Sequence, residues 1–307
     1  MNLLLVLEQA LNGLQYGVTL FLMAAGLTLV FGIMNLVNLA HGSLYMVGAY
    51  LAPTFYQWTG SFLGGVVLAL AGTLLIGIAL ELVALRTLYE RDHLDQVLAT
   101  FGLILFFNEL IAILWGRAAL YTGLPAWLGG HVPVLPGVRY PVYRAVVIVV
   151  GLAVAALLWA LVTRTRLGML IRAGASNRTM VAALGVNIRL LYTLVFGIGA
   201  ALAGLAGLMA GPIYAVQPGM GEQILIQVFV VIVIGGIGSI RGALVGAIIV
   251  GMVDTLGRAF LKPTLATFLT PSAADSAGPA LASMLIYLLM AAVLFFRPQG
   301  LFPVRVR

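Results

Sequence analysis

The sequence predicts an all-α protein, a polytopic transmembrane helical bundle of about eight to nine membrane segments. Hydrophobic residues make up 63% of its 307 residues and charged residues only 8%, whereas a soluble domain carries roughly 25% charged residues. Apolar runs recur along the chain, many of them near the roughly 20 residues that a helix needs to cross a bilayer. The runs are continuously apolar, which excludes the alternating polarity of a transmembrane β-barrel.

The runs that predict membrane segments are rich in Gly, Ala and Leu, a composition typical of closely packed membrane helices. Two of them, 38–57 and 223–235, are interpreted as possible sites of discontinuous or re-entrant helices. The first begins in a polar cluster, and the second has only about thirteen residues. All the runs belong to one predicted transmembrane domain, residues 1–307. They are 10–33, 38–57, 62–85, 95–115, 141–163, 190–211, 223–235, 242–260 and 280–296.

The basic residues predict how the bundle is oriented. Short loops rich in Lys and Arg stay on the cytoplasmic side, which places loop 86–93, the loop at about 164–190 and the C-terminus inside. The proline-containing segments 116–140 and 261–279 are expected to be external loops. The N-terminus is expected outside if 38–57 crosses the membrane, and inside if that segment only re-enters.

The loop at 164–190 contains a short predicted helix. Ser176 or Asn177 can cap a helix over 178–184 by accepting hydrogen bonds from its first turn. Gly185 can end that helix in the left-handed conformation, which residues with a Cβ resist. The sequence therefore predicts about two helical turns inside a loop that carries five arginines and no acidic residue.

This short helix has an apolar face. Met180, Ala183 and Leu184 lie at positions i, i+3 and i+4, so their side chains share one side of the helix. A solvated loop has no reason to present such a face unless another protein packs against it. We predict a docking surface here; the alternative is a loop whose positive charge only fixes the orientation of the bundle.

Two irregular stretches interrupt the apolar pattern. Asn35, Asn38 and His41 form a polar cluster between two runs, and the spacing of the two asparagines predicts that they share one helical face. Because amide and imidazole groups in hydrocarbon need partners, we predict that this cluster lies beside a translocation path. The alternative is a turn at the membrane surface, which is the favoured interpretation for the glycine-rich stretch 235–242.

Catalysis and metal binding are not predicted. The chain has no cysteine, and its three histidines form no i, i+4 pair that could hold a metal ion. No nucleophile motif is present. Glu109 and Asp254 are the carboxylates predicted to lie deepest in the membrane, and the hypothesis that they are functional competes with a position close to the outer surface.

The chain is not expected to bind ATP or nucleic acid itself. Lys262 is its single lysine and precedes a proline, so no phosphate-binding loop of the GxxxxGK type is present. The arginines gather at the ends of apolar runs, where they indicate topology and not a nucleic-acid surface. These features suggest a transport protein that is driven by a separate energy-coupling partner.

Four separated stretches resemble the LivH-type permeases of branched-chain amino acid ABC importers, and the similarity covers essentially the whole chain. The resemblance implies a subunit of the inner (cytoplasmic) membrane, and the basic residues place its C-terminus on the cytoplasmic side. It implies no cofactor in this chain, with ATP and Mg²⁺ bound by partner subunits. The four stretches are 35–43, 180–187, 196–208 and 234–243.

The resemblance also implies partners. We expect a second, similar permease, forming a heterodimer with this chain, two ABC ATPase subunits, and a soluble substrate-binding protein. The expected contacts with the ATPase come from the short helix and its end. Thr179 occupies the position where the coupling loops of ABC importer permeases commonly have Glu. The Ala-Leu-Gly end of the helix therefore matches those loops better than its start does. The expected coupling residues are Met180, Ala182, Ala183, Leu184 and Gly185.

The expected substrates are branched-chain or other hydrophobic amino acids. Members of the same family that carry urea, amides or aromatic acids are the first alternative. An ion-coupled secondary transporter or a channel is the alternative from another class. Either would need coupling residues at the bilayer midplane or a continuous polar lining, for which the sequence offers only Glu109, Asp254 and scattered asparagines.

Overall fold

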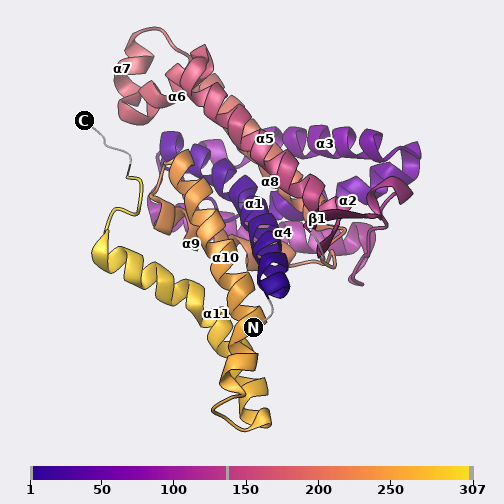
Figure 1. The fold of residues 1–307 in the computed structure, drawn as a ribbon. Coiled ribbons are helices and arrows are strands. Elements are labelled where there is room, and N and C mark those ends of the chain that lie inside the picture. Colours follow the sequence, from indigo (N-terminus) through magenta and orange to yellow (C-terminus); the bar gives the residue numbers. More distant parts are fainter. Residues whose placement is uncertain (1–2, 136–137, 304–307) are drawn as a thin grey trace.

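In the computed structural model, residues 3–135 and 138–303 are described, and they form a bundle of long α-helices with one small β-hairpin (Figure 1). The longest helix, α1 (Leu3–Met34), runs through the middle of the bundle and is largely buried. Its most extensive contacts are with α10 (Ile240–Leu265) and α8 (Ile188–Ala210). The all-α prediction is confirmed apart from the hairpin.

The predicted apolar runs correspond to nine of the eleven helices in the described ranges. Besides α1, α8 and α10, the helices are α2 (His41–Thr59), α3 (Phe62–Val83), α4 (His93–Trp115), α5 (Val142–Arg164), α6 (Arg166–Ser176), α7 (Arg178–Ala183), α9 (Met220–Gly235) and α11 (Pro271–Phe296). Of the nine helices that correspond to apolar runs, seven are long and apolar enough to cross a membrane: α1, α3, α4, α5, α8, α10 and α11. The other two, α2 and α9, do not reach the length and hydropathy that a membrane span requires. Short 3₁₀ turns lie at Leu85–Leu88 and Ala126–Leu128.

Glycines allow the central helices to approach one another closely. A Cβ added at Gly17 of α1 would lie 2.8 Å from the carbonyl oxygen of Ala247 in α10. One added at Gly26 would lie 2.8 Å from the carbonyl oxygen of Gly199 in α8. Backbones this close exclude any larger residue. The middle of α1 is therefore sealed against its neighbours.

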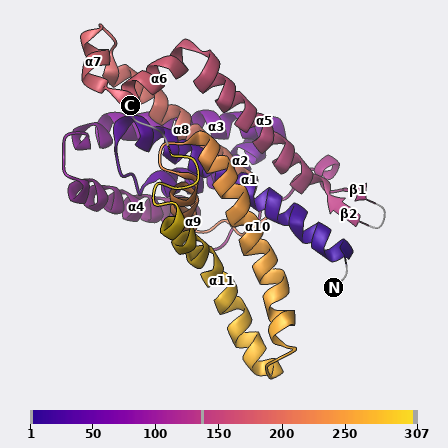
Figure 2. The same cartoon turned by 60° about the vertical axis from the view of Figure 1, so that its left-hand side comes forward.

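The connections between helices gather on two opposite faces (Figure 2). The α7 face carries the α3–α4 connection, α6, α7 and residues 297–303. The hairpin face carries the first turns of α1, the hairpin of β1 (His131–Leu135) and β2 (Val138–Pro141), and the α10–α11 connection. The predicted inner loops and the predicted outer loops thus lie on opposite faces, with the start of α1 on the face opposite the α3–α4 connection. Which face is cytoplasmic stays a prediction.

Two predicted external loops are more ordered than expected. Segment 261–279 is mostly helical: α10 continues to Leu265 and α11 begins at Pro271, so only residues 266–270 connect them. Proline fits the first turn of a helix because a backbone N–H at that position would have no acceptor within the helix, so its absence costs nothing. The 116–140 segment contains most of the antiparallel hairpin, which its short, proline-interrupted runs did not indicate.

Candidate functional site

The predicted short helix is present on the α7 face. The side chain of Asn177 caps it by accepting a hydrogen bond from the backbone N–H of Met180, at 2.9 Å. The helix ends at Ala183, one residue earlier than predicted, and Gly185 has φ 86°. A residue with a Cβ is strained in that conformation. Both the cap and the stop predicted from the sequence are confirmed.

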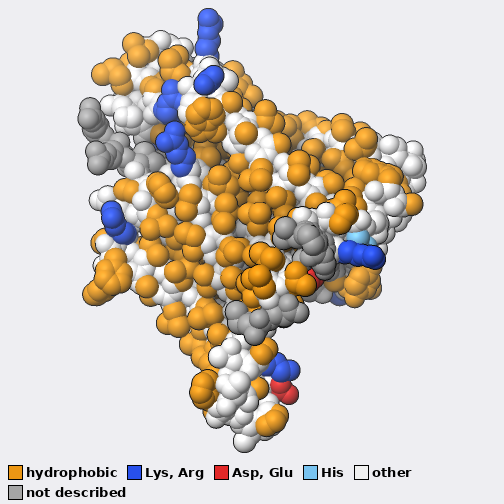
Figure 3. Space-filling view, viewed as in Figure 1, with side chains coloured by type: hydrophobic (Ala, Val, Ile, Leu, Met, Phe, Trp, Pro, Cys, Tyr) orange, Lys and Arg blue, Asp and Glu red, His pale blue; other side chains and the backbone are white. Residues whose placement is uncertain are grey.

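The apolar face of α7 points away from the rest of the chain. Val181 is 6% exposed and holds α7 against the bundle, whereas Met180 is 59% and Leu184 77% exposed. Ala182 and Ala183 are exposed as well. Arginine side chains gather over this end of the molecule (Figure 3). The arrangement fits a docking surface, and the role of these residues in coupling stays a prediction.

Helix α6, which precedes α7, was not predicted. Its apolar residues Leu167, Leu170 and Ile171 lie at i, i+3 and i+4 and pack into the hydrophobic core, a spacing that could have revealed the helix. Thr165 caps it by accepting from Gly168 N–H at 3.0 Å. Gly174 lies against Ile33 near the end of α1. Helix α6 therefore connects α7 to the central helix α1.

A pocket of about 740 Å³, the α7-side pocket, opens between the end of α1, α5, α6 and the α9–α10 turn. Its lining consists largely of aliphatic and small residues, including Gly32, Ile171 and Gly238. The polar groups come from Thr28, Asn35, Arg172, Ser176, Asn177 and Arg178. Because Arg178 is the first residue of α7, this pocket borders the predicted docking surface.

The three residues of the polar cluster occupy different surroundings. The prediction that Asn35 and Asn38 share a helical face is wrong, because α1 ends at Met34 and Asn35 adopts φ 50°. Asparagine tolerates this left-handed conformation and so ends the helix. Asn35 lines the α7-side pocket, whereas Asn38 is fully buried and its amide has no partner among the described residues.

His41 begins α2 and is also fully buried. Its ring faces α1 where Gly26 leaves room: a Cβ added there would lie 2.9 Å from His41 Nε2. A position on the lipid face is thus excluded for both His41 and Asn38. Their predicted place beside a translocation path is not tested by this packing.

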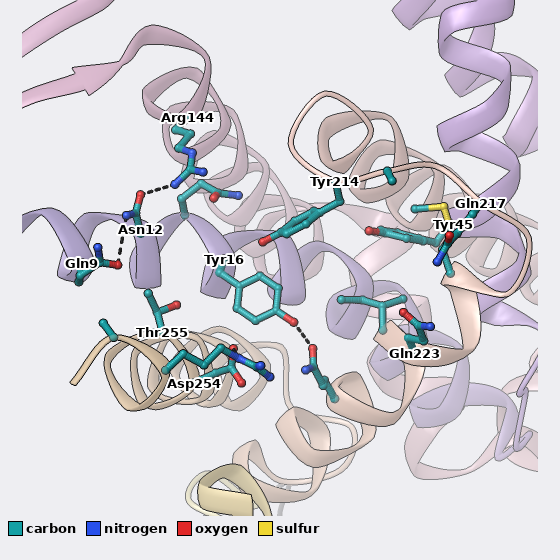
Figure 4. A pocket seen from close by; sticks show the side chains of 17 residues that line it. Gln9, Asn12, Tyr16, Tyr45, Arg144, Tyr214, Gln217, Gln223, Asp254 and Thr255 are labelled. Carbon is teal, nitrogen blue, oxygen red and sulfur yellow. Dashed lines mark hydrogen bonds and ion pairs between the residues drawn. The ribbon is translucent and has the colours of Figure 1, made fainter. Parts of the chain in front are cut away.

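A second pocket, the hairpin-side pocket, lies at the opposite end of α1 and measures about 680 Å³ (Figure 4). Side chains of α1, α2, α5, α9, α10 and the α8–α9 connection line it. Most of its lining is polar. The amide and hydroxyl groups come from Gln9, Asn12, Gln15, Tyr16, Tyr45, Tyr214, Gln217, Gln223, Gln227 and Thr255.

Hydrogen bonds and one ion pair organise this pocket. Tyr16 of α1 donates to the Gln227 amide oxygen of α9, and Arg144 of α5 donates to Asn12. In α10, Arg258 Nε donates to Asp254 Oδ2 at 2.9 Å. The other carboxylate oxygen of Asp254 is buried and has no partner among the described residues.

Sequence reasoning missed most of this pocket, although a signal was available. Gln9, Asn12 and Tyr16 lie at i, i+3 and i+7 of α1, and Gln223 and Gln227 at i and i+4 of α9. Such spacing puts polar side chains on one face of an otherwise apolar helix. A helical-wheel count within the apolar runs would have found both stripes.

The two carboxylates singled out in the sequence differ. Asp254 is 8% exposed at its side chain and lines the hairpin-side pocket. Glu109 is not deeply placed: its side chain is 61% exposed and pairs with Arg117 at 2.7 Å. Hence only Asp254 remains a candidate. Over residues 3–135 and 138–303, no group of three His, Cys, Asp or Glu side chains could hold a metal ion.

A third carboxylate, Glu81, was overlooked and anchors the α7 face. It is fully buried at the end of α3. Tyr89 donates to it at 2.6 Å, Thr193 of α8 at 2.8 Å, and Arg86 at 3.3 Å. A buried carboxylate with several donors is well satisfied. This cluster fixes the α3–α4 connection to the first turns of α8, which follow α7 in the chain.

Comparison with known proteins identifies the chain. Residues 9–294 match the family model described as branched-chain amino acid transport system / permease component. The chain therefore belongs to the branched-chain amino acid transport permease family. The sequence-based resemblance is confirmed, and this permease is a transport subunit and not an enzyme.

Relatives of this permease cover most of its length. The high-affinity branched-chain amino acid transport system permease protein BraD of Pseudomonas aeruginosa is 31% identical over 96% of this chain and 95% of its own. LivH of Escherichia coli K12 is 31% identical over 83% of this chain and 87% of its own. The ribose import permease protein RbsC of the same strain is 26% identical over 76% and 72%. No solved structure matches the chain.

Proposed function

We propose that this permease is the membrane subunit of an ABC importer for branched-chain or other hydrophobic amino acids. The match to the family over residues 9–294, with BraD and LivH aligned over more than four fifths of the chain, carries this proposal. Transport is driven by separate ATPase subunits, which bind ATP and Mg²⁺. The permease lies in the cytoplasmic membrane with its α7 face and C-terminus inside.

The two faces suit different partners. Two ATPase subunits dock on the α7 face, where the exposed side chains of Met180 and Leu184 offer the anchors that a groove on a partner recognises. A soluble binding protein delivers substrate to the hairpin face. A second, similar permease completes the pathway as a heterodimer with this chain.

The two pockets mark a route along α1. Asn12 and Gly32, which line the two pockets, are twenty residues apart on α1, or about 30 Å at 1.5 Å per residue. This is close to the thickness of the bilayer core. The glycine contacts between the pockets close the route in this conformation, as expected for a transporter that opens to one side at a time.

A second candidate function is import of urea or short amides. The observation that favours it is the lining of the hairpin-side pocket, whose many amide and hydroxyl groups suit a small polar ligand. Hydrophobic amino acids remain the main proposal because the matching family model and the relatives BraD and LivH are all described by branched-chain amino acid transport.

Uptake by the reconstituted transporter tests both candidate substrate classes and the ABC mechanism. This permease is purified with its partner permease, ATPase and binding protein and placed in vesicles that contain ATP. We expect ATP-dependent uptake of radiolabelled leucine, isoleucine and valine, and no uptake when the ATPase is inactivated. Uptake of urea without these amino acids would overturn the substrate class. Uptake by the single subunit under an ion gradient would overturn the ABC mechanism.

A further inference from the structure

The hairpin-side pocket contains an ion pair whose hydrogen-bonding groups are only partly satisfied. Asp254, near the middle of α10, is buried, and one of its carboxylate oxygens accepts from Arg258 Nε at 2.9 Å. The other oxygen, Oδ1, has no hydrogen-bond partner within the described residues. A buried carboxylate oxygen without a donor is costly. Because Asp254 lines the pocket, a bound cationic donor would satisfy this oxygen once the carboxylate turns toward the ligand.

Arg258 offers the complementary group. Its side chain is half exposed and also lines the pocket. In the described part of the chain, its Nε donates a hydrogen bond to Asp254. The forked guanidinium carries further N–H donors that fit a carboxylate. Asp254 and Arg258 are one helical turn apart on α10. An acceptor for a cation and a donor for an anion thus stand side by side.

The charges restrict the class of ligand. The ion pair is neutral overall, and Arg144, the third charged residue of the pocket, donates to Asn12. A ligand with one positive and one negative group therefore replaces the missing contacts of the pair without adding net charge. Met220, Ile224 and Ala259 also line the pocket and provide apolar surface. An α-amino acid has an ammonium and a carboxylate on one carbon, together with a side chain. A sugar or urea has neither charge.

We propose that the hairpin-side pocket binds the zwitterionic end of an α-amino acid, with its ammonium donating to the Asp254 carboxylate and its carboxylate accepting from the Arg258 guanidinium. This rests on the proposed function and adds a substrate site within the permease itself. The Gln223 and Gln227 amides lie in the same pocket and add donors and acceptors around the ligand.

Binding to the assembled permease and ATPase complex, prepared without the binding protein, tests the site. Radiolabelled leucine is the probe. Competitors are 4-methylpentanoate, which lacks the ammonium, and 3-methylbutylamine, which lacks the carboxylate. We expect Asp254→Asn to weaken leucine and the amine about 10- to 100-fold, the effect of one lost charged hydrogen bond in a partly dry site, and to spare 4-methylpentanoate.

Arg258→Gln provides a second variant with the opposite pattern: leucine and 4-methylpentanoate weaken, and the amine is spared. Asp275→Asn is the matched control. Asp275 pairs with Lys262 at 2.8 Å near the α10–α11 connection, is 60% exposed, and does not line the pocket. Its loss should leave all three ligands unchanged. Co-purification of the ATPase confirms that each variant assembles.

Two results would overturn the site. One is a wild-type complex that takes up leucine when its binding protein is present but shows no saturable leucine binding when the binding protein is absent. That result would leave the proposed function standing. The other is equal weakening of all three ligands by Asp254→Asn. Failure of the proposed function is seen separately, as absence of leucine uptake by the complete wild-type transporter.

Discussion

The two pockets at the ends of α1 are similar in size and differ in chemistry. Amides, hydroxyls and an ion pair dominate the lining of the hairpin-side pocket, whereas aliphatic side chains and glycines dominate that of the α7-side pocket, which has fewer polar groups. Polar groups fix the orientation of a small ligand and select it. A pocket with fewer of them holds a ligand less tightly. Under the proposed orientation we therefore expect selection at the hairpin end and release at the α7 end.

The largest expected effect concerns which end faces the cytoplasm. The chain has no cysteine, so Ser176→Cys on the α7 face and Ala118→Cys on the hairpin face can be made singly. Both positions are exposed. We expect an impermeant thiol reagent to label Ala118→Cys in intact cells and Ser176→Cys only after the membrane is opened. The reverse labelling would invert the assignment of selection and release.

The seal between the pockets is the next test. Gly17→Val would place side-chain atoms against the α10 backbone, since even a Cβ would lie 2.9 Å from Ile248 Cα. We expect a cost of about 1–3 kcal/mol, measured as a lower unfolding temperature, together with loss of uptake. Gly102→Val on α4 is the control, because a Cβ there meets nothing within 4 Å. Equal stability of the two variants would show that α1 and α10 are free to separate.

The α7 end is tested by its docking surface. Ala183→Asp puts a charge into the predicted contact with the ATPase, at a cost of several kcal/mol if the site is dry. We expect normal levels in the membrane and an unchanged unfolding temperature, with loss of ATPase co-purification and uptake. Ala118→Asp, exposed on the hairpin face, is the matched control. Normal co-purification and uptake by Ala183→Asp would rule docking at this position out.

The end of α7 gives a smaller effect. Gly185 has φ 86° and open space around it, so Gly185→Val adds no clash but strains the backbone by about 1–2 kcal/mol. We expect weaker ATPase binding and partial uptake. Gly123→Val, at a glycine with equally open surroundings but without positive φ, should be silent. If both variants behave alike, the shape of the helix end does not matter for coupling.

The smallest effect concerns Asn35 in the α7-side pocket. Asn35→Gly keeps the left-handed turn at φ 50° and removes only the amide. If the side chain contacts substrate, uptake should fall about two- to tenfold, the effect of one neutral hydrogen bond. Uptake at the wild-type level would show that Asn35 serves only to end α1. Asn35→Leu, which strains the turn as well, separates loss of the amide from loss of the turn.

Much of the bundle could be predicted because membrane helices follow a local rule. Each helix needs a long apolar run, and nine runs correspond to nine helices. Caps and stops are equally local, as Asn177 and Gly185 show. The helical tip around Pro271 was missed because proline was taken as a loop signal, although it is compatible with a helix start.

The pockets could not be predicted because they depend on how distant helices meet. Gln227 and Tyr16 are 211 residues apart in the chain and hydrogen bonded in space. Asp254 and Glu109 look equivalent in sequence, yet only the first is covered by neighbouring helices. Burial of a carboxylate is a property of packing, and a single sequence records only the spacing within each helix.

The length and burial of α1 bear on how the bilayer acts on this permease. α1 has 32 residues, about 48 Å at 1.5 Å per residue, well beyond a bilayer core of about 30 Å. A lipid-facing helix of that length would have to tilt or thicken the membrane. α1 avoids this because its neighbours cover it, leaving α3, α4, α5 and α11, of 22 to 26 residues, at the periphery. Hydrophobic mismatch is then absorbed by the peripheral helices. A change in acyl-chain length reaches the pockets through α5, which lines both of them, and not through α1.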